Sequence, residues 1–466
     1  MKRSDRNILI VFSFFLIGIV GIAWVALMPS DLNAQLKKDY IFLVLAYFFY
    51  AYFLWNVFVK HPIDLFEPMT FVSAMYFALL IFAPLVCIIR GTTLILGANT
   101  MSGCIKGTTV FLNSFLFFCI GYYKKISFGK TQSRIVKRER KQGCDGVVNK
   151  CQLMLLFWVV CLLLTVVYDM STGKSPLYVL MFGQVGKVAQ EQSDSSLQIL
   201  INFSYSLLGA WLYLWKAWKG HNITKIIMYL ITLSVFATRG FRFILVIALF
   251  APIVLHYLTV RKRPDLLKAM VACVVMLSLM GSFESVRNNL RTGTQITEIS
   301  TGTDALWDVF DSDFCTFKAY YGVVNAFPEK MNYMHGREMF LYTAVMMIPR
   351  ALWSGKPYPP THEVATVAMN SVAAKSGMAF PNIGEFYFEF GPIGVAVCMF
   401  VFGILCAKLK IMLEKANNLE SMITYSVTFL SLVQIIGRGY IPSNFYLLIF
   451  LNLPMILLNL NRHSRI

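Results

Sequence analysis

Two arginines in the middle of the chain are spaced so that their side chains could hold one phosphate group. Arg239 and Arg242 lie in the sequence Thr-Arg-Gly-Phe-Arg-Phe, between two apolar runs. A spacing of three residues puts both side chains on one face of a helix, although Gly240 can interrupt a helix there. Because guanidinium groups bind phosphate through paired hydrogen bonds, the pair is interpreted as an anion clamp. The alternative is that both arginines snorkel to the membrane surface or pair with a structural acid.

Other basic residues fall on the same side of the membrane in the topology that is predicted below. Cytoplasmic loops normally collect Lys and Arg, so basic residues on the opposite side need another cause. A pyrophosphate linked to a lipid would provide one. For Arg291 and Arg337 we favour the alternative of a solvated or salt-bridged surface residue. We predict that the pyrophosphate site is made of Arg239, Arg242, Arg287, Arg350, Lys356 and Arg438.

Histidine and glutamate side chains on this side could transfer protons. The candidates are Glu284, His335, His362, Glu363 and Glu385. His362 follows Lys356 in Lys-Pro-Tyr-Pro-Pro-Thr-His-Glu, and an imidazole that titrates near neutral pH suits removal of a proton from a sugar hydroxyl. A buried Glu385 could act as a base or could neutralise an arginine, and the sequence does not favour either role. We predict His362 and Glu385 as catalytic, with an ordinary loop histidine as the alternative for His362.

Several common catalytic motifs are absent from the sequence. There is no P-loop, no HExxH and no GxSxG, and the ten cysteines include neither a CxxC nor a Cys/His cluster at metal spacing. The sequence therefore predicts neither nucleotide hydrolysis nor metal catalysis. No metal and no cofactor are expected.

The composition indicates that a lipid bilayer surrounds the elements that position these residues. Of 466 residues, 57% are hydrophobic and only 14% are charged, and the mean hydropathy is +0.62. A soluble protein would be expected to carry about 25% charged residues. The net charge of +18 would suggest nucleic acid in a soluble protein, but here it follows largely from loops that obey the positive-inside rule. No nucleic-acid partner is expected.

We predict an all-α polytopic membrane protein with about twelve transmembrane helices. The first apolar run is too long for a signal peptide and no small-residue cleavage site follows it, so it is interpreted as an uncleaved span. The predicted spans are 8–28, 40–59, 69–89, 106–123, 151–168, 197–215, 223–238, 241–258, 267–283, 383–407, 420–436 and 442–460.

The orientation follows from the charge of the connecting loops. Residues 124–150 contain nine Lys or Arg against two acids, so this loop is predicted to be cytoplasmic. Counting spans outward from it puts the other basic connectors on the same side, which supports the number of spans and places both termini in the cytoplasm. These connectors are 1–6, 216–225, 261–268, 408–415 and 461–466.

The longest connector is predicted to lie on the outer side. The expected organisation is transmembrane helices 1–9 in residues 1–283, a large periplasmic loop at 284–382 and helices 10–12 in 383–466. The loop is rich in aromatic residues, which argues against a disordered linker. Its apolar stretch 339–348 is too short to cross a bilayer, so we expect short amphipathic or re-entrant helices in the loop.

Three segments together resemble the O-antigen or oligosaccharide repeat-unit polymerases of the Wzy type. They are Thr-Arg-Gly-Phe-Arg-Phe at 238–243, Ile-Pro-Arg-Ala-Leu-Trp-Ser-Gly-Lys-Pro at 348–357, and Ile-Gly-Glu-Phe-Tyr-Phe-Glu-Phe-Gly-Pro-Ile-Gly at 383–394. The similarity in architecture covers essentially the whole chain, while the motifs cover about 238–245 and 348–394. Arg239, Arg242, Arg350 and Lys356 match basic positions of that family.

The resemblance implies a membrane glycosyltransferase of lipopolysaccharide biosynthesis in the bacterial inner membrane. Such enzymes transfer a growing glycan from undecaprenyl pyrophosphate onto the next undecaprenyl-linked repeat unit at the periplasmic face, without a nucleotide sugar. A separate chain-length regulator is an expected partner.

Two other functions are compatible with the same features. An O-antigen ligase uses a similar lipid-linked donor and also carries a large outer loop. The third candidate function is that of a transporter or lipid-linked oligosaccharide flippase. Transporters usually show repeat symmetry and broken helices near the midplane, whereas the two halves of this chain do not match and its one large loop argues against that function.

Overall fold

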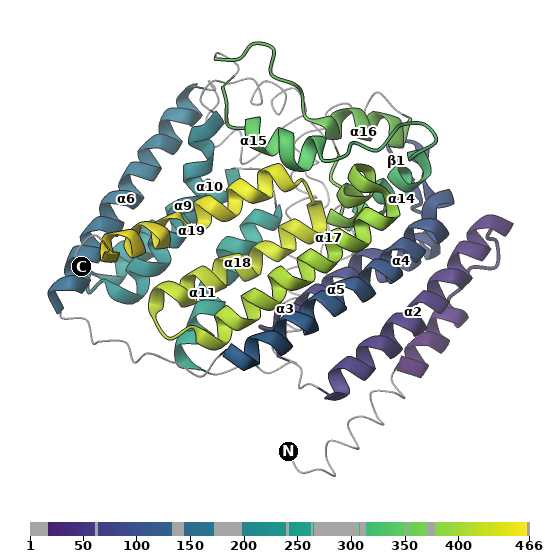
Figure 1. Ribbon diagram of the computed structural model, residues 1–466, viewed down its shortest axis with the longest axis horizontal. Helices are drawn as coiled ribbons and strands as arrows, with labels where there is room; N and C mark the ends of the chain where they lie inside the picture. The colour runs from purple at the N-terminus through teal and green to yellow at the C-terminus, as the bar shows by residue number, and fades with distance from the viewer. Residues whose placement is uncertain are drawn as a thin grey trace, which may run out of the picture.

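The computed structural model is an all-helical bundle apart from one short β-hairpin (Figure 1). It describes residues 17–60, 64–132, 144–171, 198–238, 242–261, 264, 307, 314–349, 352–370 and 378–463. The longer helices are α2 (Ala34–Lys60), α3 (Pro68–Phe77), α5 (Cys104–Gln132), α6 (Cys144–Ser171), α9 (Gln198–Ala217), α10 (Asn222–Thr238), α11 (Arg242–Val260), α14 (Thr316–Ala326), α16 (Pro360–Met369), α17 (Asn382–Lys415), α18 (Leu419–Arg438) and α19 (Ile441–His463). The shorter elements are η1 (Ala78–Phe82), α4 (Ala83–Ile89), β1 (Leu94–Ile95), β2 (Ala98–Asn99), η2 (Met101–Gly103), η3 (Arg337–Tyr342) and α15 (Thr343–Val345).

Within the described residues, eight helical segments are long and apolar enough to cross a membrane. They coincide with eight predicted spans, so the prediction of a polytopic helical membrane protein is confirmed. Their ranges are Ala34–Val57, Pro68–Ile89, Met101–Ile126, Val148–Tyr168, Phe243–Val260, Asn382–Lys415, Leu419–Arg438 and Ile441–Leu460.

The count of twelve spans stays a prediction. Shorter apolar helices at Ile17–Ala26 and Asn222–Ala237 coincide with two more of the predicted ranges. The predicted span at 197–215 coincides with helix α9, which does not meet the same measure of length and hydropathy. The predicted span at 267–283 lies outside the described residues.

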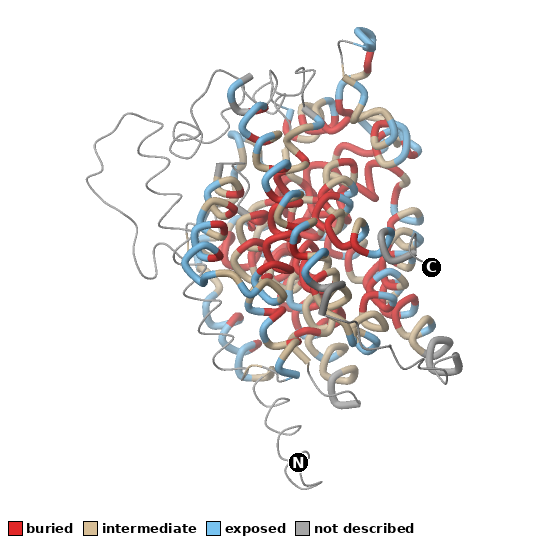
Figure 2. Tube along the Cα trace, turned by 90° about the vertical axis from the view of Figure 1, so that its left-hand side faces the viewer, coloured by how far each residue is buried: buried red, intermediate tan, exposed pale blue. Residues whose placement is uncertain are grey.

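The centre of the bundle is the pair α5 and α17, which run side by side in Figure 1. Glycines let the two backbones approach closely. A Cβ atom added at Gly403 of α17 would lie 2.1 Å from the carbonyl oxygen of Phe118, and one added at Gly121 of α5 would lie 2.2 Å from that of Phe400. Small residues serve this purpose in membrane helices, where dispersion contacts rather than water hold helices together. Buried residues accordingly gather in the middle of the bundle (Figure 2).

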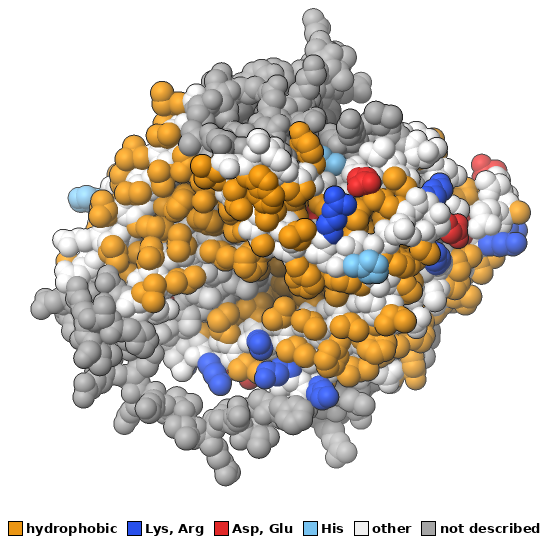
Figure 3. Space-filling model, turned by 45° about the horizontal axis from the view of Figure 1, so that its top comes forward, with side chains coloured by type: hydrophobic (Ala, Val, Ile, Leu, Met, Phe, Trp, Pro, Cys, Tyr) orange, Lys and Arg blue, Asp and Glu red, His pale blue; other side chains and the backbone are white. Residues whose placement is uncertain are grey.

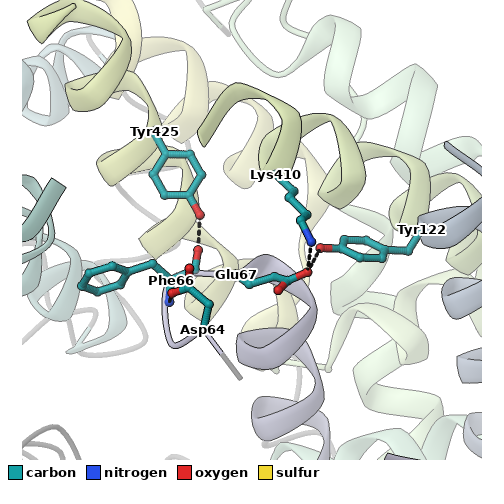
Figure 4. A network of polar contacts seen from close by, with 6 residues as sticks. All are labelled: Asp64, Phe66, Glu67, Tyr122, Lys410 and Tyr425. Atoms are coloured by element: carbon teal, nitrogen blue, oxygen red, sulfur yellow. Dashed lines mark hydrogen bonds and ion pairs between the residues drawn. The ribbon is translucent and has the colours of Figure 1, made fainter. Parts of the chain in front are cut away.

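At one end of the bundle, a polar network joins four helices that are distant in sequence (Figure 4). Glu67, which precedes α3, accepts from the ammonium of Lys410 on α17 at 2.5 Å and from the hydroxyl of Tyr122 on α5 at 2.8 Å. The hydroxyl of Tyr425 on α18 donates to the carbonyl of Phe66. Lys410 belongs to the connector 408–415, so this end of the bundle is the one predicted to face the cytoplasm.

The opposite end carries the described parts of the long connector 314–370, and α14, α15 and α16 lie there together (Figure 1). Ten of the eleven residues of α14 are buried, because the helix packs against α5, α16 and α17. The hydroxyl of Tyr320 on α14 donates to the carbonyl of Gly107 on α5 at 2.8 Å. Much of the connector therefore belongs to the folded bundle.

Hydrophobic side chains dominate the flank of the molecule (Figure 3). With the α14–α16 end turned forward, Figure 3 shows charged and histidine side chains set among them, and a separate group of Lys and Arg side chains along the lower edge. An apolar flank between two polar ends is the surface that a bilayer requires.

Candidate functional site

The first turns of α17 carry three polar residues on one face, at the end of the bundle where α14 and α16 lie. Asn382, Glu385 and Glu389 are separated by three and four residues, so their side chains line up along the helix. All three are at most 1% exposed. Gly391, at φ 69°, and Pro392 interrupt the helix immediately afterwards. Each side chain of this polar stripe (Asn382, Glu385 and Glu389) binds a different segment of the chain.

Glu385 holds the turn between α18 and α19. The backbone N–H of Ile441, the first residue of α19, donates to both carboxylate oxygens at 2.9 and 3.0 Å. A carboxylate at this position also interacts favourably with the positive end of the helix dipole. Asn382 accepts from the hydroxyl of Tyr76 on α3 at 2.9 Å, and so ties a further helix to the same stripe.

Glu389 holds the turn at the start of η3. Its carboxylate accepts from the backbone N–H groups of Gly336, of Glu338 at 2.8 Å and of Met339 at 3.2 Å. Three donors at a helix start satisfy the charge of this buried carboxylate without a basic side chain. The backbone of His335 also donates to the carbonyl of Glu389 at 2.8 Å, which fixes the approach of the chain to the turn.

Glu338 is the third acid of this cluster and is the least satisfied. Its side chain is fully buried, and one oxygen accepts from the hydroxyl of Thr361 on α16 at 2.8 Å. The other oxygen has no hydrogen-bond partner among the described residues. Burial, followed by the nearby carboxylate of Glu385, raises the pKa of Glu338 well above its ordinary value of 4.5. Burial therefore favours the neutral form of Glu338.

Arg438 is the last residue of α18 and directly precedes the turn that Glu385 holds. Its guanidinium lies 5.6 Å from the centre of the Phe243 ring, near the start of α11. Phe243 follows Arg242, the first residue of α11, whose side chain lies outside the described residues. The fold thus brings Arg438 to the start of α11, where Arg242 is found. Arg438 and Arg242 thus lie on elements that contact each other, although the two residues are 196 positions apart (438 − 242).

Lys356 is buried, at 4% exposure, and its ammonium already has backbone partners. It donates to the carbonyl oxygens of Met346 at 2.6 Å and of Ile348 at 3.0 Å, and lies 5.9 Å from the centre of the Tyr342 ring. These contacts hold the segment that leads into Pro349 and Arg350. A ligand role for Lys356 would have to use the ammonium in addition to these bonds.

His362 lies in the first turn of α16. It directly follows Thr361, whose hydroxyl donates to the carboxyl group of Glu338. Its side chain is partly buried, and desolvation lowers the pKa of the imidazole below its ordinary value of 6.5. The ring is therefore neutral at pH 7 and can accept a proton.

Three predicted site residues, Arg239, Arg287 and Arg350, lie outside the described residues. Their assignment, like that of the other candidates, stays a prediction. As for metals, the described ranges hold no group of three or more His, Cys, Asp or Glu side chains placed to bind an ion.

Sequence reasoning missed Glu389 and Glu338. For Glu389 the signal was present, because Asn382, Glu385 and Glu389 recur at helical spacing inside an apolar run. For Glu338 no local pattern exists. Its burial arises from contacts with α16 and with the polar stripe, which are distant in sequence.

The described residues thus form a polytopic helical bundle with buried carboxylates at one end. A model of the family described as O-antigen polysaccharide polymerase Wzy matches residues 8–462, nearly the whole chain. The chain therefore belongs to the Wzy family of O-antigen polysaccharide polymerases, and the resemblance seen in the sequence is confirmed. Comparison with curated proteins and with solved structures gave no match.

Proposed function

We propose that the chain joins undecaprenyl-pyrophosphate-linked repeat units of O-antigen, or of a similar surface polysaccharide, by transferring the growing chain onto the incoming lipid-linked unit. The observation that carries the proposal is the match of the Wzy family model to residues 8–462. The contact of Arg438 with Phe243 adds support, because it puts Arg438 beside the start of α11, the helix whose first residue is Arg242.

In this proposal the arginines bind the pyrophosphate of the donor. Negative charge develops on that group as the bond between the sugar C1 and the phosphate oxygen breaks. Guanidinium groups that are already held in place stabilise this charge more than they stabilise the intact donor, which lowers the barrier. Arg239, Arg242, Arg287, Arg350 and Arg438 take this role. Lys356 contributes by holding the segment before Arg350, through its bonds to the carbonyls of Met346 and Ile348.

The acceptor hydroxyl must lose a proton when it attacks the sugar, and His362 is the proposed proton acceptor. Its imidazole is neutral at pH 7 and lies in the first turn of α16, beside the buried carboxylate cluster. Both substrates are amphipathic and would reach this end of the bundle by moving laterally in the membrane.

The proposed setting is the periplasmic face of the bacterial inner membrane, with both termini in the cytoplasm. This orientation rests on the positive-inside rule applied to the loop 124–150. In this orientation the Glu67–Lys410 end of the bundle, which includes the connector 408–415, faces the cytoplasm. A separate chain-length regulator completes the proposed partners.

A deletion strain tests the function on one gel. Loss of the polymerase should leave lipopolysaccharide cores that carry a single repeat unit, and the wild-type gene should restore the ladder. An unchanged ladder in the deletion strain would refute the proposal. Cores without even one unit would instead indicate a ligase or a flippase.

A further inference from the structure

The turn between α18 and α19 has an unusual backbone that depends on contacts from α17. Gly439 has φ 50° and ψ −131°, and Tyr440 has φ 57°, so two successive residues adopt left-handed values. A Cβ atom at Gly439 would lie 2.6 Å from the carbonyl oxygen of Phe380 and 3.2 Å from a carboxylate oxygen of Glu385. Only glycine fits there, and the path of the chain after Arg438 is therefore constrained.

Glu385 is the side chain that closes this turn. Both of its oxygens accept from the backbone N–H of Ile441, and the side chain is 1% exposed. Asn444 donates to the carbonyl of Gly439 from the next turn of α19. A carboxylate in this position faces the turn, and its burial leaves no room for a sugar hydroxyl to reach it.

Arg438 is the last residue of α18 and directly precedes this turn. Its guanidinium lies 5.6 Å from the centre of the Phe243 ring, near the start of α11. Arg438 thus lies between a turn whose backbone binds the Glu385 carboxylate and the Phe243 ring.

From these contacts we infer that Glu385 is a positioning residue, which sets the 438–441 turn and thereby holds Arg438 for the pyrophosphate of the lipid-linked donor, and is not the base of the reaction. The inference rests on the proposed function, because it takes Arg438 as a ligand of that pyrophosphate. It also assigns a role to Gly439, which no sequence motif had singled out.

A double-mutant cycle on the purified protein tests the inference. Polymer formation from a lipid-pyrophosphate-linked repeat unit is measured for Glu385→Ala, Arg438→Ala and the double variant. Each single variant should lower kcat/KM by about 10- to 100-fold, the effect of losing one charge-assisted contact. The double variant should be no worse than Arg438→Ala, because Glu385 acts through Arg438. Multiplied losses in the double variant would overturn the inference.

The conservative variant Glu385→Gln separates positioning from proton transfer. Its amide oxygen still accepts from Ile441, so we expect it to stay within about tenfold of the wild-type rate and to keep the wild-type pH profile. A base would instead lose about 10²- to 10⁴-fold in kcat and its limb of the profile. Such a loss in Glu385→Gln would also overturn the inference.

Two controls complete the experiment. Glu329→Gln changes an exposed carboxylate on the same side of the bundle and should behave as wild type. A monodisperse elution profile in detergent shows that each variant is folded, and if Glu385→Ala fails this check, Glu385→Gln decides the question alone. If the wild-type protein makes no polymer, the proposed function fails rather than this inference.

Discussion

At the level of single residues, the buried carboxylates at the α14–α16 end differ in how they are satisfied. Glu389 receives three backbone N–H groups at the start of η3, and Glu385 receives the N–H of Ile441 at the start of α19. Glu338 receives the hydroxyl of Thr361 on one oxygen, and its other oxygen has no partner among the described residues. Burial disfavours the charged form of an acid, and hydrogen-bond donors offset that cost. The three buried acids of this cluster therefore differ in the donors that offset their burial.

Replacing Glu338 by Gln should stabilise the protein at neutral pH. The pKa of Glu338 is raised in the folded state, so the unfolded chain releases this proton at lower pH than the folded chain does. Its contribution to stability is complete below the unfolded pKa near 4.5 and is lost as the pH rises toward the folded pKa. Gln is always neutral and avoids that loss. Thermal unfolding in detergent should show a higher Tm for Glu338→Gln at pH 8 and a smaller gain at pH 5; a lower Tm at pH 8 would contradict the assignment.

His362 should give polymer formation a pH dependence with a low midpoint. Desolvation lowers the pKa of its imidazole below 6.5, so the ring stays neutral to lower pH than a free histidine. Activity should therefore fall on the acidic side with a midpoint below pH 6.5, as the base becomes protonated. His362→Ala should reduce kcat by about 10²- to 10⁴-fold. A fall that begins above pH 7, or full activity in His362→Ala, would exclude His362 as the base.

Residue types alone predicted part of this site. The sequence singled out Arg438 as a basic residue on the predicted outer side, His362 as an imidazole near Lys356, and Glu385 as a carboxylate at the start of an apolar run. It could not predict that the Lys356 ammonium binds the carbonyls of Met346 and Ile348, since that contact depends on how the segment folds back. The buried Glu338 lacked a sequence signal for the same reason.

At the level of elements, the contact between α5 and α17 depends on glycines at the crossing. Replacing Gly403 by Val should weaken this pair, because its Cβ would lie 2.1 Å from the backbone carbonyl of Phe118. Overpacking a tight contact costs about 1–3 kcal/mol, and backbone cannot move aside as a flexible side chain can. We expect a lower Tm and a lower yield of folded protein in detergent. Gly18→Val is the matched control, since no described atom lies within 4 Å of its added Cβ, and an equal loss in both variants would contradict this account.

Hydropathy predicted the eight described spans well, because a bilayer requires long apolar helices. It was less informative where polar residues are buried inside the bundle. Helix α9 carries Asn202, Ser204 and Ser206, which are buried against neighbouring helices and lower its hydropathy. Helix α14 lies in a segment that was predicted as an outer loop, and its burial comes from packing against α5, α16 and α17.

At the level of the whole molecule, the two ends of the bundle carry different connectors. Glu329 is exposed in the segment that follows α14, and Lys415 is exposed at the end of α17. In a variant that lacks the native cysteines, Glu329→Cys should react with a membrane-impermeant maleimide in intact spheroplasts. Lys415→Cys should react only after the membrane is opened. The reverse pattern would invert the proposed orientation, and labelling of both positions from one side would contradict the separation of the two ends.

The central claim is that this chain forms the bond between lipid-linked repeat units. The most direct measurement uses the purified protein in liposomes with an undecaprenyl-pyrophosphate-linked repeat unit as its only substrate. We predict glycans of two or more units, with one undecaprenyl pyrophosphate released for each linkage made. Recovery of single units alone, from protein that is folded and correctly inserted, would contradict the claim.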